Sequence, residues 1–338
     1  MKAAVFLEPG VLDVLDRPEP AGLACDEVLV EVECCGLCGS DVHAIAVPPG
    51  HPTAPNTIMG HEFVGHVVAR GSGVEEPAVG ARVVIDPDPK CGSCANCQRG
   101  MPYACLRLRA IGVYRDGGLA AHCRVPARAA FEISETVPSS LAAIAEPLAC
   151  VVHGVQRSAV QPGESALVFG GGSIGCMFAA LLSSSGAYPT VVLEPVARRR
   201  EIALQCGADY ALSPEEWARS GRELLPGGAD VVVDAVGSLF AAGLEAVATG
   251  GRIVLIGMNS TARAEVAQNE ITRRGLSVLG SYITNFTFPT AIRVLERGVP
   301  DLSPIVTHRL TLDEVRLGLE LLRTGEALKV VIDLNGSR

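Results

Sequence analysis

Ser165-Ala-Leu-Val-Phe-Gly-Gly-Gly-Ser-Ile-Gly175 is the stretch of the chain that decides its fold. Its apolar start predicts a short buried strand, and the series Gly170-x-Gly172-x-x-Gly175 follows directly and opens an apolar helix. Glycine is needed for the tight turn, for close approach of the backbone to a pyrophosphate, and for packing of helix on strand. The N–H groups at the start of such a helix bind phosphate. The residues expected to contact a dinucleotide are Gly170, Gly172, Ser173, Ile174 and Gly175.

A carboxylate follows the second strand of this unit. The apolar run 190–193 ends at Glu194, about 20 residues beyond the glycine series, where an acidic side chain can bind ribose hydroxyl groups. The same charge would repel the 2′-phosphate of NADP. Arginines at 198, 199 and 200 could accommodate that phosphate, or could form a solvated helix face. We therefore predict NAD as the preferred cofactor and leave NADP open, with Glu194 and Arg199 beside the ribose.

Strand and helix patterns alternate through the residues that follow. Apolar runs at 230–237, 251–257 and 276–282 read as strands. The helical spans expected between the earlier strands are centred near Leu204, Leu224 and Leu244. This alternation predicts an α/β fold with a parallel, doubly wound sheet over residues 149–288.

The remaining residues have a different character. Residues 1–148 contain short strands and many proline and glycine turns, so they are expected to be mostly β. Thr311-Leu-Asp-Glu314 forms a capping box for a helix through Leu322, and the run 329–334 reads as a closing strand. Because 338 residues exceed the usual size of one core, we expect 1–148 and 289–338 to form a second domain.

Composition excludes several classes of partner. The formal net charge of −9 argues against binding to nucleic acid or to an anionic membrane surface. The uncharged run 165–193 is long enough to cross a bilayer, but glycines and a proline interrupt it, so we reject a membrane span. Glu8 and Pro9 come too early for the apolar core of a signal peptide. We therefore expect a cytoplasmic protein with reduced thiols.

Four cysteines at short spacings predict a metal site. In Cys91-Gly-Ser-Cys-Ala-Asn-Cys-Gln-Arg-Gly-Met-Pro-Tyr-Ala-Cys105 the thiols are separated by two, two and seven residues. Four thiolates fill the tetrahedral shell of zinc and leave no position for substrate. The spacing disfavours four unrelated buried cysteines. The expected ligands of this structural zinc are Cys91, Cys94, Cys97 and Cys105.

A second, sparser set of side chains has the composition of a catalytic metal site. The segments 38–43 and 60–65 contain cysteine, histidine and glutamate in glycine-rich contexts, and a further glutamate precedes Pro147. A catalytic zinc needs about three protein ligands and an open position. The candidate ligands are Cys38, His61 and one or both of Glu62 and Glu146.

These motifs together resemble the zinc-containing medium-chain alcohol and polyol dehydrogenases over essentially the whole chain. The matching segments are Cys35-Gly-Leu-Cys-Gly-Ser-Asp41, Gly60-His-Glu-x-x-Gly65, the four-cysteine loop, Asp116-Gly-Gly118, the glycine series and Lys329-Val-Val-Ile332. The resemblance implies a GroES-like catalytic domain and a Rossmann coenzyme domain. Many primary alcohol dehydrogenases have a cysteine at position 146, whereas Glu146-Pro-Leu148 is similar to the sorbitol, xylitol and butanediol dehydrogenase branch.

For individual residues, the resemblance implies roles around one catalytic zinc. Cys38 and His61 would be ligands, Glu62 a third or exchanging ligand, and Glu146 a ligand bound directly or through water. Asp41 would orient His61. Two residues would move the proton of the substrate hydroxyl. Those residues are Ser40, as first acceptor, and His43, closer to solvent.

The resemblance also implies the reaction. A small-molecule alcohol would be oxidised by NAD(P) at a secondary carbinol of a polyol, sugar, cyclitol or aminocyclitol, with two zinc ions per chain. The chain would form a homodimer or homotetramer through the run 276–282. One alternative is a dehydrogenase of an amino alcohol or hydroxy acid such as threonine. Another is a catalytically silent dinucleotide-binding sensor, which the intact ligand set disfavours.

Overall fold

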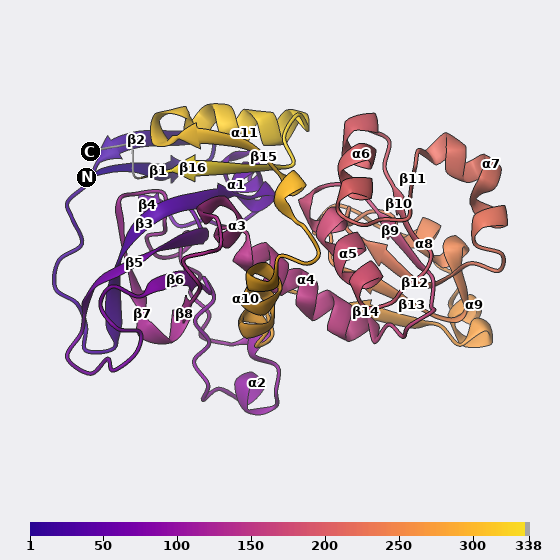
Figure 1. Ribbon diagram of the computed structural model, residues 1–338, viewed down its shortest axis with the longest axis horizontal. Coiled ribbons are helices and arrows are strands. Elements are labelled where there is room, and N and C mark those ends of the chain that lie inside the picture. Colours follow the sequence, from indigo (N-terminus) through magenta and orange to yellow (C-terminus); the bar gives the residue numbers. More distant parts are fainter. Residues whose placement is uncertain (335–338) are drawn as a thin grey trace. The chain divides into compact units, whose positions relative to one another are not determined.

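The computed structural model describes residues 1–334 and divides the chain into two compact units (Figure 1). The first unit comprises Met1–Ala149, Thr284–Arg297 and Val306–Arg338, and the second comprises Cys150–Ile283 and Gly298–Ile305. Residues 335–338 of the domain predicted from the sequence lie outside the described residues. None of the helices within residues 1–334 combines the length and the apolar composition that crossing a bilayer requires.

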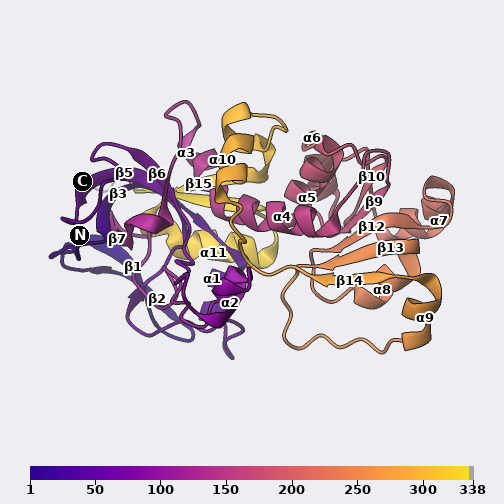
Figure 2. The ribbon, with the colours of Figure 1, turned by 90° about the horizontal axis from the view of Figure 1, so that it is seen from below.

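The second unit is built on a six-stranded sheet in which every pair of neighbours is parallel. Its strands are β9 (Ala166–Phe169), β10 (Thr190–Leu193), β11 (Tyr210–Leu212), β12 (Ala229–Asp234), β13 (Val247–Leu255) and β14 (Ser277–Gly280). The order β11-β10-β9-β12-β13-β14 is that of a Rossmann fold, and Figure 2 shows β10, β9, β12, β13 and β14 following one another across the sheet. The predicted doubly wound sheet is therefore confirmed.

Helices cover both faces of this sheet (Figure 1). The helices are α5 (Ser173–Ser184), α6 (Ala197–Gln205), α7 (Pro214–Leu224), α8 (Phe240–Ala246) and α9 (Gln268–Arg274). Helices α5 and α6 contact β9, β10 and β11, whereas α8 contacts β12 and β13. With both faces covered, the central strands are almost continuously buried, as in β9 and β12. Leu244 lies within α8, as predicted, but the other two predicted helix centres were displaced. Leu204 and Leu224 lie in the last turns of α6 and α7, because these helices begin at Ala197 and, after the Ser213 cap, at Pro214.

The first unit is mostly β. A sheet in the order β15-β16-β3-β5-β6-β8, with β7 also paired to β3, lies beside a smaller sheet, β2-β1-β4. The strands are β1 (Lys2–Glu8), β2 (Val11–Asp16), β3 (Glu27–Leu37), β4 (Thr57–Ile58), β5 (Glu62–Arg70), β6 (Arg82–Ile85), β7 (His122–Pro126), β8 (Ala130–Glu132), β15 (Val306–Thr311) and β16 (Lys329–Asp333). The helices are α1 (Gly39–Ile45), α2 (Ala95–Gln98), α3 (Ser139–Ala142), α10 (Phe288–Arg297) and α11 (Val315–Thr324), and α4 (Ala145–Ser158) begins in this unit.

The closing segment of the first unit completes its main sheet. The predicted capping box forms between Thr311 and Glu314, and α11 follows it. Strand β16 then pairs antiparallel with the end of β3, with Val330 opposite Leu37. This pairing places Lys329 beside the point where β3 ends and α1 begins.

Candidate active site

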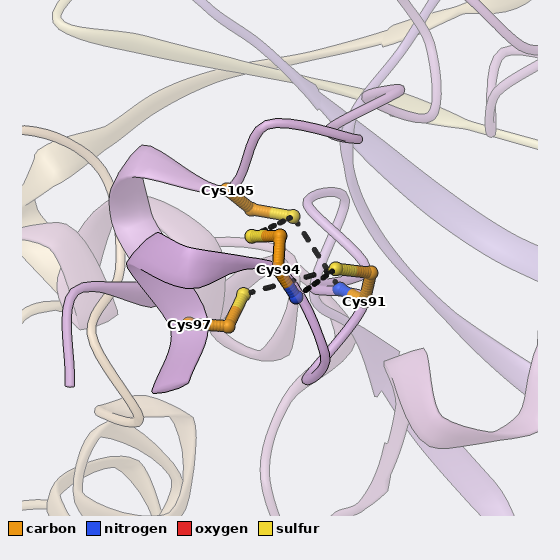
Figure 3. A group of neighbouring side chains, drawn as sticks. All are labelled: Cys91, Cys94, Cys97 and Cys105. Carbon is orange, nitrogen blue, oxygen red and sulfur yellow. Dashed lines mark hydrogen bonds between the residues drawn. The ribbon is translucent and has the colours of Figure 1, made fainter. Parts of the chain in front are cut away.

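The four cysteines of the loop 91–105 converge (Figure 3). The Sγ atoms of Cys91 and Cys97 lie 4.0 Å apart, as do those of Cys94 and Cys105. Thiolates about 2.3 Å from a tetrahedral zinc lie about 3.8 Å from one another, so the spacing fits a zinc ion. The backbone N–H of Ser93, aided by that of Cys94, lowers the pKa of the Cys91 thiol to about 6, which favours the thiolate that a metal binds. Burial and the neighbouring thiols instead raise the pKa of Cys97 to about 12, so in the absence of a metal the four thiols are not all ionised.

A second cluster unites Cys38, His61 and Glu62, whose ligand atoms all lie within 4.8 Å of one another. Cys38 caps α1 directly after β3, and Glu62 is the first residue of β5. The β3–β5 register pairs Gly36 with Glu62, which brings the two strand ends together. Sulfur, imidazole nitrogen and carboxylate oxygen form a donor set that suits zinc.

Asp41 and Ser40 surround the imidazole of His61. Asp41 accepts a hydrogen bond from the Cys38 backbone N–H (2.9 Å), and its other oxygen lies 3.5 Å from His61 Nδ1. Ser40 Oγ lies 3.4 Å from His61 Nε2. Burial disfavours a charged ring, but the negative charges of Asp41 and Cys38 outweigh it and raise the pKa of His61 well above its usual value. The environment therefore favours a cation at this position.

Glu62 has a partner that the sequence analysis did not identify. Lys329 Nζ lies 2.6 and 2.7 Å from the two Glu62 carboxylate oxygens and donates to Leu37 O at 3.1 Å. The lysine and glutamate side chains are 3% and 0% exposed. Burial opposes the ammonium charge, but Glu62 and Cys38 raise the pKa of Lys329. Glu62 is thus both a candidate metal ligand and half of a buried ion pair.

The remaining predicted residues of this site lie at different depths. Glu146 is buried on α4 and is not part of the three-residue cluster, although its charge contributes to the raised pKa of Lys329. His43 is exposed on α1. His51, to which the sequence analysis gave no role, is part-buried; burial and then the charge of His61 lower its pKa, so it lies near the cluster.

The glycine series leaves an open cradle at the start of α5. Gly170 has φ of +95°, and a Cβ on Gly175 would lie 1.8 Å from Gly170 O, so neither position accepts a side chain. A Cβ on Gly172 would meet nothing within 4 Å, and no side chain caps α5 there. Ser173 and Ile174 form the first turn of α5, so their N–H groups face the open space beside Gly172. This arrangement fits a pyrophosphate.

Glu194 lies at the carboxyl end of β10 beside this cradle. Its carboxylate accepts hydrogen bonds from the backbone N–H groups of Gly171 (2.7 Å) and Val196 (2.9 Å). Arg200 instead donates to the Glu194 and Pro195 carbonyl oxygens at 2.9 and 2.7 Å, which ties it to the backbone. Arg199 lies close enough to Cys176, on α5, for its charge to act on that thiol. The structure therefore brings Glu194 to the glycine series and assigns Arg200 a local backbone role.

Comparison with known proteins agrees with this geometry. Residues 24–135 match the model of the alcohol dehydrogenase GroES-like domain, and residues 173–297 match that of the zinc-binding dehydrogenases. Among curated relatives, L-threonine 3-dehydrogenase of Pyrococcus abyssi is 34% identical over 330 residues, covering 95% of this chain and 94% of the relative. D-Altritol 5-dehydrogenase of Agrobacterium fabrum is 37% identical over 324 residues, covering 93% and 94%.

Solved structures extend the similarity to cofactor complexes. A zinc-binding dehydrogenase from Sinorhizobium meliloti 1021 bound to NADP has a TM-score of 0.92 and 34% identity, with 98% of each chain covered. An alcohol dehydrogenase from Escherichia coli CFT073 complexed with NADH has a TM-score of 0.90 and 30% identity, with 99% of each chain covered. Each of these relatives therefore matches this chain through both units.

Proposed function

The chain belongs to the zinc-containing medium-chain alcohol and polyol dehydrogenases, and we propose that it oxidises a secondary alcohol of a polyol, sugar, cyclitol or aminocyclitol with NAD(P). The observation that carries this proposal is the convergence of Cys38, His61 and Glu62 in a unit that also holds Asp41 and Ser40. Similarity to the threonine dehydrogenases supports an amino alcohol as the second candidate substrate.

Each residue of the cluster has a task in this reaction. When bound, zinc lowers the pKa of an alcohol hydroxyl, and nicotinamide accepts a hydride. Cys38 Sγ and His61 Nε2 would hold the metal, and Asp41, whose carboxylate lies 3.5 Å from Nδ1, would orient the imidazole. Ser40 Oγ would accept the proton of the substrate hydroxyl, and His43 would pass it towards solvent.

The two glutamates differ in their contacts. Glu62 would be a third or exchanging ligand, because Lys329 competes with the metal for its oxygens. Glu146 would bind the metal directly or through water, and its location outside the three-residue cluster favours the water-mediated arrangement. An exchanging carboxylate leaves a coordination position for the substrate oxygen.

The proposed cofactors follow from the two metal-ligand clusters and the glycine cradle. We propose two zinc ions per chain, one at the four cysteines and one at Cys38 and His61. NAD is the preferred nucleotide because the Glu194 carboxylate lies beside the glycine series, and the NADP-bound relative keeps NADP as the alternative, with Arg199 near its phosphate.

The larger-scale organisation is also a proposal. Residues 1–148 and 289–338 would form the catalytic domain, and 149–288 the coenzyme domain. Strand β14 lies at an edge of its sheet, so pairing of this strand between chains would form a homodimer or homotetramer. The location proposed for this assembly is the cytoplasm. Sedimentation at micromolar concentration tests this, and a monomer would contradict it.

Turnover and binding together test the proposed function. Zinc-loaded protein should reduce NAD with at least one alcohol from a panel of diols, polyols, cyclitols and amino alcohols. Cys38→Ser should abolish turnover while the Kd for NAD changes little, because the thiol is not part of the glycine cradle. Absence of turnover with every alcohol in zinc-replete, NAD-binding protein would overturn the proposal.

A further inference from the structure

Asp88 lies on the segment that connects β6 to the four-cysteine loop. Strand β6 pairs antiparallel with β5, with Val64 opposite Val84 and His66 opposite Arg82. After β6 ends at Ile85, the chain therefore continues towards the beginning of β5, where His61 and Glu62 lie.

A second loop joins the same two segments. Ile111 N donates to Pro87 O at 2.8 Å, and the adjacent Gly112 is so close to Gly60 that a Cβ on it would lie 2.4 Å from Gly60 O. Pro87 and Gly60 are thus held on either side of residues 111–112. Asp88 follows the first of them, and the candidate ligand His61 follows the second.

The carboxylate of Asp88 is buried and has no counter-charge of its own. The residue is 6% exposed, and within residues 1–334 its carboxylate makes no hydrogen bond or ion pair. The nearby Lys90 is committed elsewhere, since its Nζ lies 2.7 Å from an Asp86 oxygen and 2.7 Å from Thr284 Oγ1. Lys90 is thus paired with Asp86, and Asp88 is left without an ion pair of its own among the described residues.

Burial raises the pKa of Asp88 to about 6, and the negative charge of Asp86 adds to this effect, while the positive charges of Lys90 and His61 act in the opposite direction. The effect of His61 agrees with the two backbone connections in placing the carboxylate near the Cys38–His61–Glu62 cluster. A buried charge without a partner is costly, and such costs are concentrated at functional sites.

We propose that Asp88 selects the substrate by binding a protonated amino group of an amino alcohol or aminocyclitol whose carbinol is oxidised at the Cys38–His61–Glu62 cluster. This inference rests on the proposed function. An ammonium group supplies the missing charge and donates hydrogen bonds, whereas a hydroxyl group would leave the carboxylate uncompensated. A metal ion is a poorer fit, because Asp88 is in neither metal-ligand cluster found among the described residues.

The test compares two alcohols that differ in one group. The probes are 3-aminobutan-2-ol and butane-2,3-diol, oxidised by zinc-loaded enzyme with saturating NAD at pH 8. Wild-type enzyme should have at least a tenfold higher kcat/KM for the amine. Asp88→Asn should lower the ratio of the two kcat/KM values by about 10- to 100-fold, the effect of losing one charge-assisted hydrogen bond. Asp88→Glu keeps the charge and should retain part of the preference.

Controls separate charge recognition from structural damage. Asp26→Asn makes the same charge change at a 62% exposed carboxylate in the same unit and should leave the ratio unchanged. In the wild type, KM for the amine should rise as pH passes the pKa of the substrate's amino group, whereas KM for the diol should not follow that titration. This readout needs no variant, so a poorly folded Asp88→Asn protein would not remove the test.

The outcomes distinguish the two proposals. Oxidation of the diol with no preference for the amine, or an unchanged ratio in Asp88→Asn, overturns the role of Asp88 and leaves the dehydrogenase function standing. No turnover of any alcohol overturns the dehydrogenase function, and the inference with it.

Discussion

Lys329→Met should strongly destabilise the zinc-free protein. Lys329 Nζ contacts both Glu62 oxygens at 2.6 and 2.7 Å, and neither side chain is more than 3% exposed. At an effective dielectric constant of about 20, charges about 2.7 Å apart attract by about 6 kcal/mol before desolvation is subtracted. Methionine fills nearly the same volume, so the main effect is an unpaired buried carboxylate. Removing one partner of a buried ion pair lowers the free energy of unfolding by about 3–5 kcal/mol.

A double-mutant cycle isolates this interaction. Adding Glu62→Gln removes the stranded charge, so Lys329→Met/Glu62→Gln should recover most of the lost stability, with a coupling energy of at least about 2 kcal/mol. The measurement is urea unfolding of zinc-free protein, followed by circular dichroism. Zinc should stabilise Lys329→Met more than wild type, because the freed Glu62 can then bind the metal.

The chain offers a matched control for the same substitution. Lys2 pairs with Asp313 at 3.1 Å, but the two side chains are 52% and 67% exposed, so Lys2→Met should change stability by less than about 0.5 kcal/mol. A coupling energy below about 0.5 kcal/mol between positions 329 and 62 would refute the reasoning, since the two side chains would then contribute to stability independently of each other.

Three further predictions concern other parts of the molecule. Cys97→Ser should remove one zinc per chain in metal analysis and lower the melting temperature; an unchanged zinc count would contradict the four-cysteine site. Glu194→Ala should raise KM for NAD relative to KM for NADP, and a constant ratio would argue against a ribose contact. Asp88 has a folded-state pKa of about 6, above its ordinary 3.8, so the folded protein prefers the protonated carboxyl group. The resulting stability is fully present below about pH 4 and is lost as pH rises through about 6. In zinc-free protein, the free energy of unfolding of Asp88→Asn should therefore exceed that of the wild type by about 3 kcal/mol at pH 7 and equal it near pH 3.5. Urea unfolding at both pH values measures this difference, and a difference that does not change with pH would show that the carboxylate is not buried as described.

Local patterns were sufficient to predict much of this molecule. The strand, glycine series and helix at 165–184 depend on neighbours in sequence, as does the four-cysteine loop, and the parallel sheet and the capping box at Thr311 were confirmed. The roles of individual site residues remain predictions, although the structure gathers Cys38, His61 and Glu62.

Pairings between distant segments could not be predicted in the same way. Lys329 and Glu62 are 267 residues apart, and their contact depends on the pairing of β16 and β5 with opposite sides of β3. One signal was available: the chain has only three lysines, and one of them lies in the apolar run 327–332. The approach of Asp88 to His61 depends on the contacts of residues 111–112 with Pro87 and Gly60, for which no local pattern exists.

The second unit is inserted in the sequence of the first, and this affects the order in which the two can fold while the chain is being translated. Residues 150–283 are contiguous and can form their sheet as they emerge, whereas the main sheet of the first unit is completed only when β15 and β16 join it beside β3. Until residue 329 is available, Glu62 lacks its ammonium partner and is open to capture by a metal ion. Proteolysis of nascent chains stalled before and after this point, with and without zinc, would reveal whether the ion protects the incomplete sheet. The order in which metal and lysine reach Glu62 would thus be set by translation.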